Sequence, residues 1–188
     1  MYSERNIEKS ILEATKEYPV IMVCGQRQVG KLTMLNHIKE NNRRYVSFDD
    51  RNARRLAETD PALFFETYGY PILIDEFQKV PSILETIKDI VDKLGNDGKN
   101  NNGLFWLTGS QKFKMMKGIS DSLAGRVAIF EMSSLSLREI EGKDANLFNP
   151  DLEAIKKQSF EYKNVNEIYQ RIFDGGMPKI IAHPSAKV

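Results

Sequence analysis

Residues 25–31, GQRQVGK, place two glycines and a lysine at the spacing G-x-x-x-x-G-K. The segment follows an apolar run, residues 20–24, and precedes a stretch with apolar residues at helical spacing. Glycines let successive backbone N–H groups turn toward an anion, and the N-terminus of the following helix adds a favourable dipole. The pattern therefore predicts a phosphate-binding loop, with Lys31 reaching the outer phosphates of a nucleotide. A glycine-containing turn with a surface lysine is the alternative, and the strand and helix context disfavours it.

The complete motif has Ser or Thr after the lysine, because that hydroxyl binds Mg²⁺, but this chain has Leu32 there. Thr33 lies about 100° further around a helix, so it cannot simply replace that ligand, although it could bond an inner phosphate. Water can also take the place of a missing ligand. We expect weaker Mg²⁺–nucleotide affinity and slower turnover, with nucleotide binding retained. The residues assigned to nucleotide binding are Gly25, Gln26, Arg27, Gln28, Val29, Gly30, Lys31, Leu32 and Thr33.

Two carboxylates, Asp75 and Glu76, directly follow the apolar run 72–74. In an open α/β sheet, ligands bind at the C-terminal ends of the strands. We predict that Asp75 holds Mg²⁺, directly or through water, and that Glu76 orients and activates a water for attack on the γ-phosphate. Asp-Glu after a strand is a weak pattern by itself, but it becomes strong about 45 residues after a phosphate loop.

Two further polar residues, Ser110 and Arg126, are candidates for the same chemistry. Ser110 ends a Thr-Gly-Ser segment after the next apolar run and either touches the γ-phosphate or the attacking water, or caps a helix. Arg126 either stabilises transition-state charge, in its own or a neighbouring subunit, or is a surface arginine beside a turn. Both pairs of interpretations stay open. The candidate catalytic residues are Glu76, Lys31, Ser110 and Arg126.

Apolar runs alternate with helical stretches, and these elements must position the candidate residues. Strands that are apolar at nearly every position indicate a parallel sheet covered on both faces, so the fold class is α/β. The expected strands are 20–24, 44–48, 72–74, 104–107 and 127–132. Helices are expected from about residue 30, after Asp49 or Asp50 as a cap, from Asp60-Pro61, and over residues 81–94.

Composition excludes several classes of protein. The chain has 188 residues, 41% of them hydrophobic, and a formal net charge of +1, so it can form a core but carries no global basic field. One cysteine and two distant histidines offer no disulfide or zinc pattern, and no signal peptide or membrane span is present. A cytoplasmic protein is expected. Cys24, at the end of a buried strand, is interpreted as a packed residue in preference to a redox switch.

An arginine-rich segment raises nucleic-acid binding as a further hypothesis. Acidic neighbours dilute its charge, so a solvated helix face is the favoured interpretation and nucleic acid is not an expected partner of this domain alone. The five arginines are Arg43, Arg44, Arg51, Arg54 and Arg55. Beyond Asn149-Pro150 the chain becomes charged and helix-like. The expected division is therefore a core over residues 1–150 and a helical extension over 151–188.

Four motifs in order resemble a family of prokaryotic AAA+-type ATPases with G-x-R-Q-V-G-K-T-T, I-D-E-x-Q-x-x-P, T-G-S and S-L-A-G-R. They occur here at residues 25–33, 74–81, 108–110 and 122–126. The resemblance runs from about residue 5 to Pro178. It implies a P-loop NTPase of the AAA+/RecA-like class, a three-layer αβα sandwich with parallel strand order 5-1-4-3-2. It also implies ATP and Mg²⁺ as ligands, and Lys31, Asp75 and Glu76 as the central site.

This chain also departs from the family pattern in two ways. Family members have threonine where this chain has Leu32, which places full hydrolysis in question, and they continue into a C-terminal domain, so this chain is expected to be the ATPase part of a longer protein. The predicted function is Mg²⁺-dependent ATP hydrolysis by an AAA+-type ATPase domain. The alternative is a nucleotide-binding switch or interaction module that does not turn over. The expected partners are the nucleotide, an unidentified protein and further copies of the chain, with no membrane.

Overall fold

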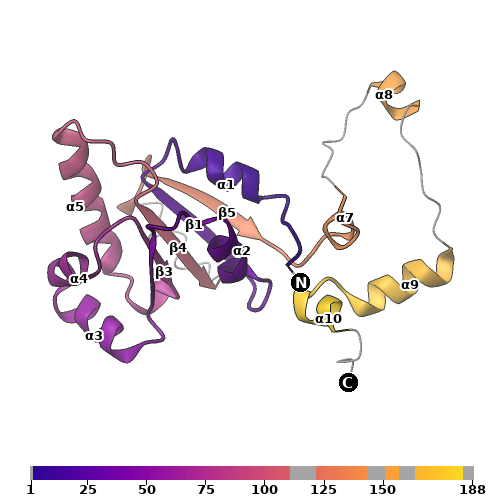
Figure 1. Ribbon diagram of the computed structural model, residues 1–188, viewed down its shortest axis with the longest axis horizontal. Coiled ribbons are helices and arrows are strands. Elements are labelled where there is room, and N and C mark those ends of the chain that lie inside the picture. Colours follow the sequence, from indigo (N-terminus) through magenta and orange to yellow (C-terminus); the bar gives the residue numbers. More distant parts are fainter. Residues whose placement is uncertain (1, 111–121, 144–150, 157–163, 184–188) are drawn as a thin grey trace. The chain divides into compact units, whose positions relative to one another are not determined.

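One parallel β-sheet organises the chain. The computed structural model describes residues 2–110, 122–143, 151–156 and 164–183. Its strands are β1 Val20–Gly25, β2 Arg44–Ser47, β3 Ile72–Asp75, β4 Phe105–Ser110 and β5 Val127–Met132. All adjacent pairs are parallel, in the order β2-β3-β4-β1-β5 (Figure 1). Counted from the other edge, this is the predicted order 5-1-4-3-2, which is confirmed.

The inner strands β1, β3 and β4 are buried on both faces, as their apolar runs predicted, whereas the edge strands β2 and β5 are only partly buried. Alternate side chains of a strand face opposite sides of a sheet. Val20, Met22 and Cys24 of β1 join one large core cluster with residues of the helices that follow β2 and β3. Ile21 and Val23 are equally buried but lie outside that cluster. The inner strand β1 is therefore apolar and buried at every position from Val20 to Cys24, and it ends at Gly25.

The helices of this unit cover the two faces. Their bounds are α1 Glu8–Ala14, α2 Lys31–Ile38, α3 Arg51–Thr59, α4 Pro61–Tyr68, the 3₁₀ helix η1 Phe77–Lys79 and α5 Ile83–Asn96. Helices α3, α4 and α5 lie together, away from α1 and α2, which contact each other (Figure 1). Of the two aspartates predicted as a cap, Asp50 accepts from the N–H of Asn52. Helix α4 begins at Pro61, as predicted, and Asp60 also caps it by accepting from the N–H of Leu63.

A second compact unit combines the N-terminal residues with the chain after residue 133, whereas residues 7–133 form the first unit. Its described helices are α7 Leu137–Ile140, α8 Leu152–Lys156, α9 Val165–Asp174 and α10 Pro178–Ala182. The boundary expected at residue 150 lies outside the described residues and stays a prediction.

A buried ion pair holds the second unit together. Arg5 Nε lies 3.0 Å from Glu139 Oε1, and the two side chains are 5% and 7% exposed. The backbone N–H groups of Asn6 and Ser136 also donate to the Glu139 carboxylate, at 2.9 and 2.7 Å. Burial by itself would raise the pKa of Glu139, but these N–H donors and Arg5 lower it below its usual value. The carboxylate is thus fixed in its charged form.

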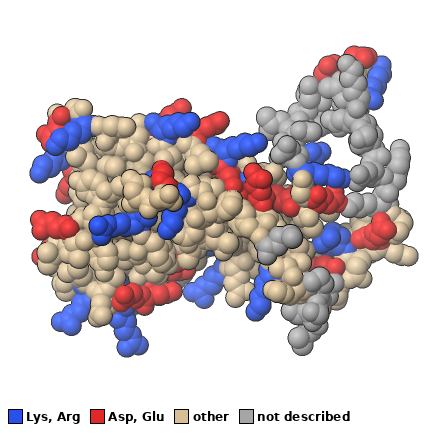
Figure 2. Space-filling model, in the orientation of Figure 1, with Lys and Arg blue, Asp and Glu red and all other residues tan. Residues whose placement is uncertain are grey.

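Charge is mixed over the surface. On the face that Figure 2 shows, Lys and Arg side chains are interspersed with Asp and Glu, in keeping with the net charge of +1. Of the helices that the structure describes, none combines the length and apolar character that crossing a membrane requires.

Candidate functional site

The predicted phosphate loop joins β1 to α2 with a tightly turned backbone. Gly25 has φ +147°, and a Cβ there would lie 2.1 Å from the carbonyl oxygen of Met132, so only glycine fits beside β5. Gly30 has φ +94° at the N-cap of α2. Between them, Gln26, Arg27 and Gln28 are exposed, with Gln28 also left-handed. Val29 is fully buried and anchors the exposed loop to the core.

Lys31 folds back over this loop. Its Nζ donates to the carbonyl oxygens of Gly25 and Gln26, at 3.0 and 2.8 Å, and the residue is 9% exposed. Burial lowers the pKa of Lys31, while the charges of Glu76 and Asp75 act in the opposite direction. The amino group therefore lies within electrostatic reach of both predicted acidic residues, which come from a different strand.

Asp75 ends β3 beside the end of β4. The hydroxyl of Thr108 donates to Asp75 Oδ1, and Thr108 is 1% exposed. Ile74 pairs with Leu107, so the next residues of the two strands are neighbours. The sequence alone does not identify Thr108 as a partner of Asp75. Its position in the Thr-Gly-Ser segment, at the same sheet edge, was the available signal.

Tyr45 of β2 also reaches this edge. Burial raises the pKa of the Tyr45 phenol, and the charge of Asp75 raises it further. The neighbouring Ser47 pairs with Asp75 in the strand register. Tyr45 was not among the predicted site residues, because an aromatic residue in a short strand is ordinarily a packing residue.

Glu76 follows in a left-handed conformation, with φ +54° and ψ +37°, which directs the chain into η1. The Gln78 side-chain amide donates to Glu76 Oε2 and, at 3.3 Å, to Ser110 Oγ. The structure therefore brings Ser110 to the same place as Glu76. The alternative for Ser110, a helix cap, concerns residues 111–121, which lie outside the described residues.

The site offers Mg²⁺ an incomplete set of protein oxygens. Leu32 is half-buried in the first turn of α2 and supplies none, and Thr33 is exposed. Asp75, held by Thr108, is a carboxylate at the edge where a hard cation would meet the phosphates. These residues fit an ion that takes its remaining ligands from phosphate and water oxygens.

The AAA domain family matches residues 17–141. This chain belongs to that family. It is 30% identical over 149 residues to two uncharacterised proteins, Mb2031c of Mycobacterium bovis and Rv2008c of Mycobacterium tuberculosis. The match covers 78% of this chain and 32% of each relative, so the chain spans about a third of their length.

Solved structures share the fold of this AAA domain. AMPPCP-bound DnaA from Aquifex aeolicus has a TM-score of 0.51 at 19% identity, covering 96% of this chain and 58% of its own. The Walker-type ATPase PABY2304 of Pyrococcus abyssi has a TM-score of 0.55 at 15% identity, covering 96% of this chain and 65% of its own. Together with the sheet order, they establish a P-loop ATPase fold.

Arg126 of the AAA domain lies at the other edge of the sheet. Arg126 directly precedes Val127, the first residue of β5, which pairs with Val20 at the start of β1, whereas Gly25 pairs with Met132 at the end of β5. At about 3.3 Å per residue, this separates the arginine from the loop by roughly 20 Å. Its guanidinium binds both carboxylate oxygens of Asp92, at 2.6 and 2.9 Å. The structure does not bring Arg126 to the site of its own chain, and a role in a neighbouring subunit stays a prediction.

The arginine-rich segment does not form one basic surface. Arg43 is 4% exposed, with its guanidinium 4.1 Å from the centre of the Trp106 ring and 2.7 Å from the carbonyl oxygen of Gly103. It is a structural cation in a cation–π contact. The residues Arg44, Arg51 and Arg55 are exposed, and Arg54 is half-buried. Helix α3 turns Ala53 and Ala57 inward, so its arginines occupy a solvated face, as favoured above.

Cys24 is 2% exposed, and its Sγ donates to the carbonyl oxygen of Phe130 at 3.5 Å. Burial, and then the charge of Glu131, raises the pKa of this thiol. A thiol that resists ionisation is a poor nucleophile, so its interpretation as a packed residue is confirmed.

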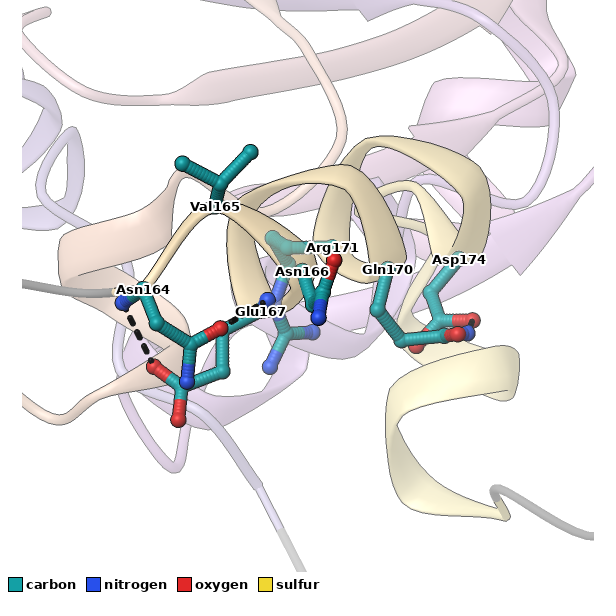
Figure 3. A pocket seen from close by; sticks show the side chains of 7 residues that line it. All are labelled: Asn164, Val165, Asn166, Glu167, Gln170, Arg171 and Asp174. Carbon is teal, nitrogen blue, oxygen red and sulfur yellow. Dashed lines mark hydrogen bonds between the residues drawn. The ribbon is translucent and has the colours of Figure 1, made fainter.

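A hollow of about 650 Å³ lies along α9, away from every predicted site residue in sequence. Figure 3 shows that its lining comes entirely from this helix and its cap. The carboxylate of Glu167 and the side chain of Asn164 are occupied with capping the helix, and Gln170 bonds Asp174 at 2.8 Å. Because no second element faces these groups among the lining residues, the hollow is a surface feature without evident chemistry.

Proposed function

We propose that the AAA domain binds ATP with Mg²⁺ and hydrolyses the γ-phosphate. The observation that supports this proposal is that Asp75 and Glu76, on one segment, both act on the pKa of Lys31, which lies on another. The buried amino group of Lys31 sits on the loop carbonyls of Gly25 and Gln26 and interacts electrostatically with both carboxylates. A cation beside a curled backbone and two acids suits a bound polyphosphate.

In this proposal the loop residues 25–33 hold the phosphates, chiefly through backbone N–H groups and the N-terminus of α2. Lys31 moves from the carbonyls of Gly25 and Gln26 to the outer phosphates. Asp75, oriented by Thr108, holds Mg²⁺ directly or through water. When bound, this ion neutralises charge on the phosphate oxygens.

Glu76 acts on the attacking water. Its carboxylate accepts a proton as the water oxygen forms a bond to the γ-phosphorus. The bond between that phosphorus and the oxygen bridging to the β-phosphate breaks, and its electron pair stays on ADP. The other product is inorganic phosphate, and Glu76 returns to its carboxylate form by releasing the proton. Ser110 donates its hydroxyl hydrogen to the γ-phosphate or to the water.

A second candidate function rests on Leu32. A half-buried leucine replaces an oxygen ligand in the first turn of α2, which favours a nucleotide-binding switch or interaction module without turnover. Both candidates require ATP binding, and they differ in whether phosphate is released.

The test measures ATP affinity by titration and phosphate release at steady state. Lys31→Ala should weaken ATP binding at least tenfold, about 1.4 kcal/mol or more. Glu76→Gln should keep binding and lower kcat about 10²- to 10⁴-fold. Lys99→Ala is the matched control for the lysine, because Lys99 is a surface residue paired with Asp97 in the loop after α5.

Leu32→Thr separates the two candidates. It should raise Mg²⁺-dependent turnover, whereas Leu12→Thr, at an exposed leucine of α1, should not. Turnover in the unaltered chain that Glu76→Gln removes would exclude the switch. Binding without turnover, even in Leu32→Thr, would support the switch. ATP binding unchanged by Lys31→Ala would contradict both.

We also propose that Arg126 acts on the nucleotide of a neighbouring copy. Turnover per chain should then rise with protein concentration, and Arg126→Ala should remove that rise. Turnover independent of concentration in both proteins would leave the Arg126–Asp92 pair with a structural role alone.

A further inference from the structure

One side-chain amide connects the ends of β3 and β4. Gln78 lies in η1, and its Nε2 donates to Glu76 Oε2 and to Ser110 Oγ, the latter at 3.3 Å. An amide nitrogen carries two hydrogens, so a single group can serve both acceptors. The proposed water-activating carboxylate is thereby linked to a hydroxyl on another strand.

The orientation of this amide is set by chemistry. An ionised carboxylate accepts hydrogen bonds and donates none, so the nitrogen of Gln78 must face Glu76. The amide oxygen is consequently turned inward, where it is buried with no hydrogen-bond partner in the described part of the chain. Leaving a buried acceptor unpaired is unfavourable, so another interaction must hold the amide in this orientation.

Packing against β4 holds the amide in this orientation. A Cβ at Gly109 would lie 2.5 Å from Gln78 Oε1 and 2.9 Å from Phe77 Cε1. The middle residue of the Thr-Gly-Ser segment is therefore glycine because η1 lies directly against it. Thr108 and Ser110, on either side of Gly109, contact Asp75 and Gln78 respectively. The segment contacts both acidic residues at the end of β3, Asp75 directly and Glu76 through the glutamine.

We propose that Gln78 is a positioning residue that couples Ser110 to Glu76 during ATP hydrolysis, which rests on the function proposed above. Its amide occupies Glu76 Oε2 and leaves Oε1 to face the attacking water. Because Ser110 Oγ accepts from Gln78, its own hydrogen is directed elsewhere, toward the γ-phosphate. Contact of Ser110 with that phosphate then sets the orientation of the amide, and through it the orientation of the carboxylate. Gln78 itself touches neither substrate nor water.

The first test replaces the amide and keeps its bulk. Gln78→Met retains a side chain of similar length and removes both donors. Its matched control is Gln170→Met, because Gln170 also uses its amide to bind a carboxylate, that of Asp174 on the exposed helix α9. We expect Gln78→Met to lower kcat about 10- to 100-fold, with ATP affinity and KM changed less than about twofold. Gln170→Met should match the unaltered chain.

A double-mutant cycle tests whether Ser110 acts through the glutamine. Ser110→Ala should lower kcat in the unaltered chain. It should have little further effect in Gln78→Met, because both substitutions break the same Ser110–Gln78 interaction. Independent, multiplicative effects would overturn the coupling. An unchanged kcat in Gln78→Met, with the unaltered chain active, would overturn the positioning role while leaving ATP hydrolysis intact.

A second measurement does not depend on turnover. The side-chain ¹⁵N–¹H signals of Gln78, assigned by their loss in Gln78→Met, should shift with AMPPCP, which has a γ-phosphate, and not with ADP. Equal signals with both nucleotides would overturn the proposal. If neither the unaltered chain nor Leu32→Thr releases phosphate, the hydrolysis proposal fails, and these signals still decide whether Gln78 responds to the γ-phosphate.

Discussion

Two helices of this chain carry apolar side chains at the same helical spacing and have opposite surroundings. On α5 the apolar residues are buried, namely Ile83, Leu84, Ile87 and Val91. On α9 they are between 46% and 82% exposed, namely Val165, Ile168, Tyr169, Ile172 and Phe173. Helical spacing therefore tells which residues share a face, and it does not tell whether anything covers that face.

The difference follows from what each helix has beside it. Helix α5 joins the core cluster of residues 7–133, which includes residues of strands β1 to β4, with Val127 of β5 packed against it. Each fully buried aliphatic side chain there is stabilised by about 1.5–3 kcal/mol relative to its exposed state. The apolar residues of α9 gain little of this. The described parts of the second unit depend more on local capping and on the Arg5–Glu139 pair.

The largest expected effect tests the two helices directly. Ile87→Ala removes a fully buried side chain from α5 and should lower the free energy of unfolding by about 2–5 kcal/mol. Ile172→Ala, at a residue 70% exposed on α9, should change it by no more than about 0.5 kcal/mol. Denaturant unfolding of the full chain measures both. Equal losses would mean that α9 is packed in solution.

A glycine substitution compares packing in the two units. Gly109→Ala should destabilise by about 1–3 kcal/mol, because its Cβ would lie 2.5 Å from Gln78 Oε1. Gly176→Ala should also destabilise, because its Cβ would lie 2.3 Å from the carbonyl oxygen of Leu135. Gly95→Ala in α5 is the control, with its nearest atom at 3.4 Å, and should be neutral or stabilising. Thermal unfolding ranks the stabilities of the three variants. A Gly176→Ala variant as stable as the unaltered chain would mean that the second unit is less tightly packed at this glycine than the first unit is at Gly109.

Glu139→Gln tests whether the second unit depends on charge. This substitution should lower the free energy of unfolding by about 1–2 kcal/mol at neutral pH, because the neutral amide weakens the bonds from Arg5 and the two backbone N–H groups. The pKa of Glu139 is lowered by folding, so its contribution is present above the usual glutamate pKa and disappears as pH falls through the folded value. Unfolding measured from pH 7 downward should therefore show the variant and the unaltered chain converging. Glu153→Gln, at an exposed pair with Lys156, should change little at any pH.

The smallest effect on stability is expected at Phe173, the last of the exposed apolar residues of α9. Phe173 is 82% exposed, so Phe173→Ser should change the free energy of unfolding by less than about 0.5 kcal/mol. It should nonetheless reduce the fluorescence of a dye that binds exposed apolar surface. A loss of more than about 1 kcal/mol would contradict the contrast between the helices.

Much of the fold could be predicted from the sequence. The positions of β1, β3 and β4 followed from apolar runs, because these strands are buried on both faces. Gly25 and Gly30 occur where the loop needs positive φ angles. Helix α1 was missed, because seven residues with few apolar positions give little periodicity. The strand order came from the resemblance to a family, because nothing in a single chain's periodicity states which strands are neighbours.

The candidate site was predicted in part. Lys31, Asp75 and Glu76 were predicted from motif spacing, and the charges of the two carboxylates act to raise the pKa of the lysine, against the larger lowering caused by its burial. Arg126 and Arg43 show the limit. Arg126 pairs with Asp92 at the opposite end of the strands, and Arg43 is buried over the ring of Trp106. Charge in a sequence does not state where a long side chain will end.

The sequence by itself determined the chemical groups, their order and the strands that end in them, because backbone preferences and burial act over a few residues. Only the tertiary structure decided which groups meet. The ends of β3 and β4 lie side by side, so Thr108 binds Asp75 and Gln78 joins Glu76 to Ser110 across that gap. Such contacts depend on register and packing between segments about thirty residues apart, and no local pattern in the chain encodes them.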